Sequence, residues 1–236
     1  MRKLLFVTYG IVGLVLAMLP TKTYATTLLP PGNCIGLCAA SLGTIDSLTF
    51  SGAVVATTGG AVSFMGTNAI GQTRFTGKVE EEVIQDVGGF LDFVYQFEDL
   101  TGDAITTMAV TDYTGFVTNV GTNAGNLITP PGGTVGPAAI SRGSSGGTIT
   151  FDFAPNTPSG LGNGVETLEL VVKTNATAFA AGSINFTDGG IATVVGFAPT
   201  GVTTTPEPSL AALLASGLLT TGALVGFRRR KHHPKN

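Results

Sequence analysis

The chain has 236 residues, 34 of them glycine and none tryptophan, and its formal net charge is −3. That charge is unevenly spread: residues 26–205 carry four of the twelve basic residues and fourteen of the fifteen acidic ones, a net charge of −10. A region this acidic repels phosphate backbones, which argues against nucleic acid as a partner. Both histidines, His232 and His233, lie outside it, so it holds no Ser–His or Cys–His catalytic pair.

Residues 1–25 have the order of a secretory signal peptide. Arg2 and Lys3 form a basic start, Leu4 to Leu19 is apolar, and Ala25 offers a small residue for cleavage. We therefore expect the general export machinery to carry the chain across a bacterial inner membrane and signal peptidase to cut it. An uncleaved anchor is the alternative, because the apolar stretch is nearly long enough to span a bilayer.

Residues 26–43 are rich in Thr, Pro and Gly and predict an extended lead-in to the folded domain. They contain both cysteines, Cys34 and Cys38. A local disulfide between them suits an oxidising compartment, and two free thiols are the alternative. A metal site would need further Cys or His ligands, which are missing here.

Residues 44–198 predict an all-β domain. Apolar and polar residues alternate in several segments, with the period of a strand that has one buried face. These segments are 91–98, 148–153, 168–173 and 183–187. Asp188-Gly189-Gly190 then indicates a hairpin turn between two strands. No segment has a helical period, so we expect a single antiparallel β-sandwich or jelly roll.

Residues 121–147 interrupt this pattern. They have little apolar periodicity and contain Pro130-Pro131-Gly132-Gly133 and Ser144-Ser145-Gly146-Gly147. Gly and Pro clusters of this kind are typical of turns and loops. We expect a long surface excursion with little strand.

Two groups of acidic residues need an explanation. The run Glu80-Glu81-Glu82 indicates a charged strand that discourages edge-to-edge pairing. Glu98, Asp99 and Asp103 surround a glycine-containing turn and are candidate Ca²⁺ ligands through their oxygens, although a solvated turn explains them more simply. We expect no cofactor and no other metal site.

Residues 199–208 predict a linker, because each proline lacks a backbone donor and restricts the residue before it. Residues 209–227 contain no charge, and a helix of that length spans about 28 Å, close to the thickness of the hydrocarbon core of a bilayer. Residues 228–236 then form a basic tail. Its Arg228, Arg229, Arg230 and Lys231 favour the cytoplasmic side of the membrane and set the orientation.

Pro206-Glu207-Pro208, followed at once by an apolar span and an arginine cluster, resembles the PEP-CTERM sorting signal of Gram-negative bacteria. The resemblance covers roughly residues 205–231. It implies processing near the motif by an exosortase, a membrane-embedded transpeptidase-like enzyme, with Pro206, Glu207 and Pro208 as the recognition residues. The prolines keep the backbone extended for cleavage, and Glu207 suits the positive end of the following helix. A plain membrane anchor with a chance motif is the alternative.

The same resemblance suggests an association with extracellular polysaccharide and biofilm matrix. We therefore expect an exported surface or matrix protein with no catalytic activity of its own. It would be anchored in the inner membrane with its domain in the periplasm, and later released or attached at the cell surface. The alternatives are a secreted glycan-binding module, with or without Ca²⁺, and a secreted hydrolase that uses a carboxylate pair.

Overall fold

A computed structural model describes residues 28–39, 41–49, 51–123, 133–154 and 160–202. These residues form strands, turns and loops and no helix, which confirms the expected all-β class. The strands are β1 (Cys34–Gly36), β2 (Asp46–Ser47), β3 (Gly52–Thr57), β4 (Val62–Thr67), β5 (Thr73–Asp86), β6 (Leu91–Gly102), β7 (Thr107–Val110), β8 (Thr118–Asn123), β9 (Ala139–Arg142), β10 (Ile149–Asp152), β11 (Val165–Glu166), β12 (Glu169–Thr174), β13 (Ala176–Thr187) and β14 (Ile191–Val202).

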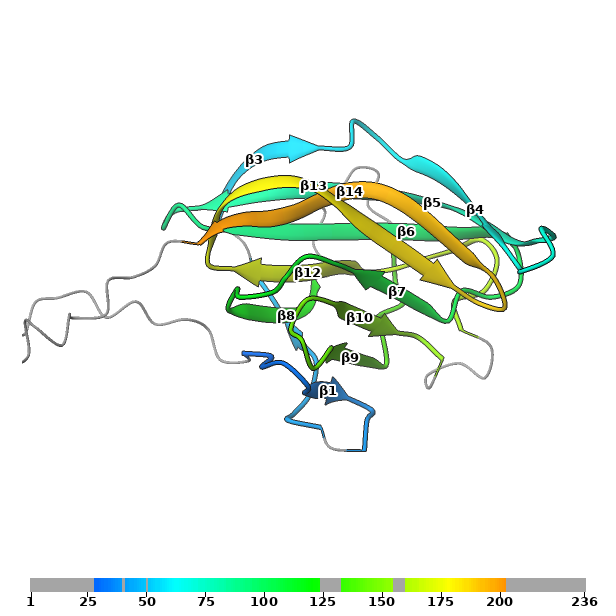
Figure 1. Cartoon of the computed structure of the whole chain (residues 1–236), viewed down its shortest axis with the longest axis horizontal. Helices are drawn as coiled ribbons and strands as arrows, with labels where there is room; N and C mark the ends of the chain where they lie inside the picture. Colours follow the sequence, from blue (N-terminus) through cyan, green and yellow to red (C-terminus); the bar gives the residue numbers. More distant parts are fainter. Residues whose placement is uncertain (1–27, 40, 50, 124–132, 155–159, 203–236) are drawn as a thin grey trace, which may run out of the picture.

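The strands belong to one hydrogen-bonded sheet that curls so that its inner faces pack together (Figure 1). The order along the sheet is β1-β9-β10-β7-β13-β14-β4-β5-β6-β12-β8-β2, with β11 beside β6 and β3 beside β5. Two separate sheets were expected. The pairing instead continues from one half to the other through a single residue pair, Ile191 of β14 with Thr67 of β4.

Long strands make this continuity possible. β5 has 14 residues and pairs along one side with β6. On its other side, the first part of β5, up to Val79, pairs with β4, and the last part, from Glu82, pairs with β3. The sequence shows the alternation within such strands but does not show which partner each part of a strand takes.

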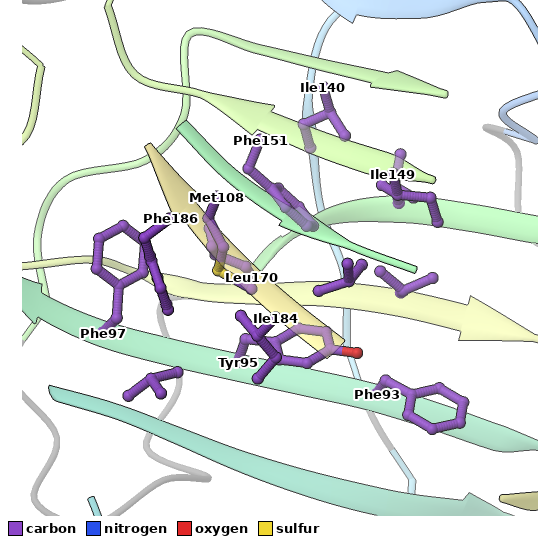
Figure 2. Packing of buried hydrophobic residues seen from close by; sticks show 14 of the residues in the cluster. Phe93, Tyr95, Phe97, Met108, Ile140, Ile149, Phe151, Leu170, Ile184 and Phe186 are labelled. Atoms are coloured by element: carbon purple, nitrogen blue, oxygen red, sulfur yellow. The ribbon is translucent and has the colours of Figure 1, made fainter. Parts of the chain in front are cut away.

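The core lies between the two halves of the curled sheet. Phe93, Tyr95 and Phe97 of β6 point inward and are fully buried, as the alternating pattern predicts. Phe97 lies 5.0 Å from Phe186 of β13 between ring centroids, and 5.4 Å from Phe153, which follows β10. Figure 2 shows these inward side chains from β6, β7, β10 and β13 meeting in one cluster.

The folded region extends beyond the expected range of 44–198. β1 lies within the expected lead-in and pairs with β9 at Cys34 and Ser141. β14 continues to Val202, where it pairs with Ala176. The hairpin expected at Asp188-Gly189-Gly190 joins β13 to β14.

The expected surface excursion over residues 121–147 is wrong in part. β8 ends at Asn123, and β9, from Ala139 to Arg142, is a paired strand between β1 and β10. Ile140 is fully buried and Arg142 is 5% exposed. β9 has only four residues, among them a serine and an arginine, which is too short for an alternation of apolar and polar residues to be recognised in the sequence. Its strand structure becomes evident only from its pairing with β1 and β10.

Several expectations concern residues outside the described part of the chain. They are the signal peptide (1–25), the Pro206-Glu207-Pro208 motif, the apolar span (209–227) and the basic tail (228–236). In the described part, no helix is long and apolar enough to cross a membrane.

Candidate functional site

A cavity among the described strands lies where β14 separates from β4. After the pair Ile191–Thr67, no further register pair joins these two strands. The gap forms a pocket of about 400 Å³ that we name the seam pocket. It is lined by residues of the β3–β4 connection and of the β13–β14 hairpin, namely Thr57, Thr58, Val62, Phe179, Ala180, Ala181, Val195, Gly196 and Phe197.

The lining of the seam pocket is mostly apolar with an aromatic wall. Phe179 and Phe197 meet edge to face, with ring centroids 5.3 Å apart. Phe179 is 36% exposed and Val195 is 72% exposed, so both present apolar surface to solvent. Thr57 and Thr58 supply the hydroxyl groups of the lining. The pocket is therefore suited to an apolar or amphipathic ligand surface.

Glu81 of β5 lies beneath the β14 wall of this pocket and is fully buried. Its Oε2 accepts a hydrogen bond of 2.8 Å from the backbone N–H of Phe197. Its own backbone N–H donates to Thr58 Oγ1 at 3.2 Å, and its carbonyl accepts from the Thr58 N–H at 3.0 Å. Glu81 thereby connects both walls of the pocket.

Burial raises the pKa of Glu81 to about 8, and the hydrogen bond from the Phe197 N–H acts in the opposite direction. The carboxyl group is therefore largely protonated at neutral pH. Tyr95 and Tyr113 are also fully buried, with their hydroxyl oxygens 2.7 Å apart. Burial raises the pKa of both phenols well above the usual value.

A second, smaller cavity of about 160 Å³ lies on the outer face of β5, β6 and β11, and we name it the acidic cavity. Lys78, Glu80, Glu98 and Glu166 line it together with Gln96. Gln96 donates from Nε2 to the Thr167 carbonyl at 3.0 Å.

Neighbouring charges affect the carboxyl groups of this cavity. Burial raises the pKa of Glu80. Burial also raises the pKa of Glu166, with further contributions from the charges of Glu98 and Glu80. Glu166 and Glu98 are direct cross-strand partners, and Lys78 faces Glu98 from the other side. The arrangement concentrates negative charge and partly balances it with one lysine.

The candidate Ca²⁺ ligands Glu98, Asp99 and Asp103 do not form one site. Glu98 and Asp99 are adjacent on β6, so their side chains point to opposite faces of the sheet. Asp99 is fully buried, where its Oδ2 accepts from the Ile105 N–H at 3.3 Å, and Asp103 forms an ion pair with Arg74. Across the described residues, no three Asp, Glu, His or Cys side chains are grouped to hold a metal ion.

Cys34 and Cys38 are joined by a disulfide. The bridge closes a small loop at β1, whose strand pairs with β9. It therefore lies at the end of the sheet, and neither cysteine lines the two cavities.

Sequence reasoning missed the buried Glu81. The run Glu80-Glu81-Glu82 was expected to protect a sheet edge, but β5 is an interior strand between β6 and the β3 and β4 strands. The sequence did indicate this burial. Val79 and Val83 point into the core, and because side chains alternate between the two faces of a strand, Glu81 between them points the same way.

The chain was compared with protein-family models, with curated proteins and with solved structures. None of these three comparisons found a match.

Proposed function

We propose that this chain is an exported, transiently membrane-anchored surface or matrix protein, sorted through its C-terminal tail and without catalytic activity of its own. The observation that carries the proposal is the order of features in the tail: Pro206-Glu207-Pro208, an uncharged span over 209–227, and Arg228 to Lys231. A signal-like segment at residues 1–25 complements this tail. The partners are then the export machinery with its signal peptidase, and an exosortase-type processing enzyme.

The position of the folded domain is compatible with this role. β14 ends at Val202, four residues before Pro206. Seven extended residues reach at most about 25 Å, so the segment from Val202 to Ser209 would hold the domain close to the membrane until cleavage. The acidic domain is also repelled by anionic lipid headgroups, which favours its release after cleavage.

The test is to replace Pro206, Glu207 and Pro208 by alanine in the full-length chain in its native host. We expect an uncut precursor to accumulate in the membrane fraction, while the unaltered chain yields a shorter mature form. Replacing Thr203, Thr204 and Thr205 by alanine is the matched control and should leave processing intact. Mass spectrometry of the mature C-terminus locates the cut. Normal processing of the Pro-Glu-Pro variant would refute the sorting proposal.

The seam pocket favours glycan binding as a second candidate function. Sugar rings present apolar C–H faces to aromatic side chains and hydroxyl groups to polar ones, and the pocket combines Phe179 with Thr57 and Thr58. Glycan-array binding of the full-length chain, with and without a chelator, tests this candidate and its dependence on Ca²⁺. Phe179→Ala should abolish the binding, whereas Val54→Ala on exposed β3 should not.

A further inference from the structure

One edge of β13 is left open by the strand beside it. β7 pairs with β13 only from Ile184 to Thr187. The last hydrogen bond between the two segments runs from the Thr111 N–H to the Ser183 carbonyl at 3.2 Å. Asp112 then has φ = 72°, the only positive φ of a non-glycine residue in the described part of the chain. This left-handed residue turns the chain away from β13 and exposes the rest of its edge.

The register of the hairpin shows which backbone groups point outward along residues 177–181, which we name the open edge. β13 and β14 pair without a shift from Ala176 to Thr187. Because Ser183 bonds toward the β7 side, every second residue before it points the same way. The N–H and C=O groups of Thr177, Phe179 and Ala181 therefore face away from β14.

The open edge lacks the usual protection against strand pairing. Its five residues are exposed, and β13 contains no charged residue and no proline. Other edges in the described structure are protected: β3 has a register shift between Val54 and Ala56, and β1 and β2 are only three and two residues long. On β14, Pro199 occupies an edge-facing position where its missing N–H costs no strand hydrogen bond.

We propose that the open edge binds the same edge of a second copy of this chain, antiparallel and centred on Phe179. In that register Phe179 faces Phe179 of the other copy, and Thr177 faces its Ala181. All these residues direct their N–H and C=O groups outward, so each facing pair exchanges two hydrogen bonds. The contact is the same on both copies and closes on itself, which gives a dimer and no growing fibre.

The open edge is uncharged and complementary to itself, which favours a second copy as the occupant against the repulsion between the acidic domains. Residues 26–205 carry a net charge of −10, so two copies repel each other over most of their surface. The open edge offers an approach without carboxylates, and it is complementary to itself through its backbone. This proposal does not rest on the sorting function, because the edge belongs to the folded domain.

Cysteine cross-linking in the full-length chain, reconstituted in lipid vesicles, tests this register. Ala178 of one copy would face Ala180 of the other in a pair without hydrogen bonds, where Cα atoms are about 4.5 Å apart and a disulfide fits. The native cysteines are already joined to each other, so they do not compete. A mixture of Ala178→Cys and Ala180→Cys chains should yield about fivefold more cross-linked dimer than either variant alone.

The matched control is a mixture of Val54→Cys and Val55→Cys chains on exposed β3, which should show no excess. Association through residues 209–227 would affect all mixtures equally and so cannot produce the expected difference. Adding Ala181→Pro, which removes one outward N–H, or Ala181→Asp, which places charges in the contact, should abolish the excess, while Ala181→Ser should keep it. The proposal would be overturned if another pair of cysteine positions gave a higher yield of cross-linked dimer, or if the Ala178→Cys and Ala180→Cys mixture gave no more dimer than the β3 control.

Discussion

Glu81 Oε2 accepts a 2.8 Å hydrogen bond from the Phe197 N–H, so a side chain of β5 replaces a strand partner that β14 has lost. Phe197 lies six residues beyond the single pair that joins β14 to β4. Its N–H points toward the gap, where no strand accepts it. A buried carboxyl group is costly unless it is hydrogen-bonded or protonated. Only Oε2 of Glu81 is hydrogen-bonded within the described residues, and Oε1 is buried without a partner, so protonation near neutral pH reduces the cost of burial.

Glu81 should make the stability of the domain depend on pH. Its pKa is about 8 in the folded chain and near the ordinary 4.5 of a glutamate in the unfolded chain, so the folded state holds its proton more tightly. The free energy of unfolding therefore falls as pH rises from 4.5 to 8, with a slope approaching about 1.4 kcal/mol per pH unit. Burial also raises the pKa of Asp92 and Asp99, each to about 6, so these two carboxyl groups add to the slope near pH 6 and Glu81 dominates it only from about pH 7 to 8.

Glu81→Gln should remove most of this slope between pH 7 and 8 and make the domain more stable than the unaltered chain at pH 8. The amide oxygen can still accept from the Phe197 N–H. Denaturant titrations at several pH values measure the effect. Glu80→Gln, one residue away on the outer face, is the control and should retain the slope. An unchanged slope in Glu81→Gln would contradict the assignment.

Gly196 should be intolerant of any side chain, because a Cβ there would overlap Glu81 Oε2 and lie 2.8 Å from Ile184 Cδ1. Gly196→Ala must push the carboxyl group or the strand aside, and we expect a loss of about 1–3 kcal/mol in the free energy of unfolding. Gly162→Ala is the matched control, since its Cβ would meet no atom within 4 Å. Equal stability of the two variants would show that β14 moves freely at the gap.

The sequence predicted which segments form strands, but it did not predict which strands pair with each other. Phe93, Tyr95 and Phe97 alternate with polar or smaller residues, and that period alone places them in the core. The seam pocket depends on where β14 leaves β4, which is a property of two strands far apart in sequence. Glu81 was misassigned for the same reason: its burial depends on β14, which begins more than a hundred residues later.

Tyr95 and Tyr113 should show strong energetic coupling. Tyr95→Phe removes one hydroxyl group and leaves its buried partner, 2.7 Å away, without that hydrogen bond. We expect each single Phe variant to lose about 1–3 kcal/mol, and the double variant to lose less than the sum. Denaturant unfolding of the three variants completes the double-mutant cycle. Additive losses would contradict a direct interaction.

Repulsion between carboxylates in the acidic cavity should lower the stability of the domain. Glu166 and Glu98 face each other directly across β11 and β6. Like charges in such a pair are destabilising, so Glu166→Gln should raise the free energy of unfolding at pH 7 by about 0.2–1 kcal/mol. The gain should shrink in high salt, which screens exposed charges. Asp112→Asn, at an exposed acid that lines neither cavity and where the amide oxygen can still accept from the Thr111 hydroxyl, is the control. A loss of stability in Glu166→Gln would instead indicate that the carboxylate makes a favourable contact.

Arg142 was invisible to sequence reasoning, because an arginine in a short segment suggests surface. The structure buries it, and its guanidinium group donates to five acceptors at 2.8 to 3.1 Å. These acceptors are the carbonyls of Leu29, Tyr113, Phe116 and Gly146 and the hydroxyl of Thr118. One side chain thus connects the N-terminal segment, the loop after β7, the start of β8 and the β9–β10 turn.

Arg142→Lys should therefore be strongly destabilising although it keeps the positive charge. A single ammonium group cannot reach acceptors arranged around a planar fork, so several buried carbonyls would lose their donor. We expect a loss of at least about 3 kcal/mol in the free energy of unfolding, together with faster proteolysis near Leu29. Arg74→Lys, at an exposed arginine that forms an ion pair with Asp103, is the control for exchanging the two residue types. If Arg142→Lys proves as mild as this control, the five hydrogen bonds do not hold the N-terminal segment in place.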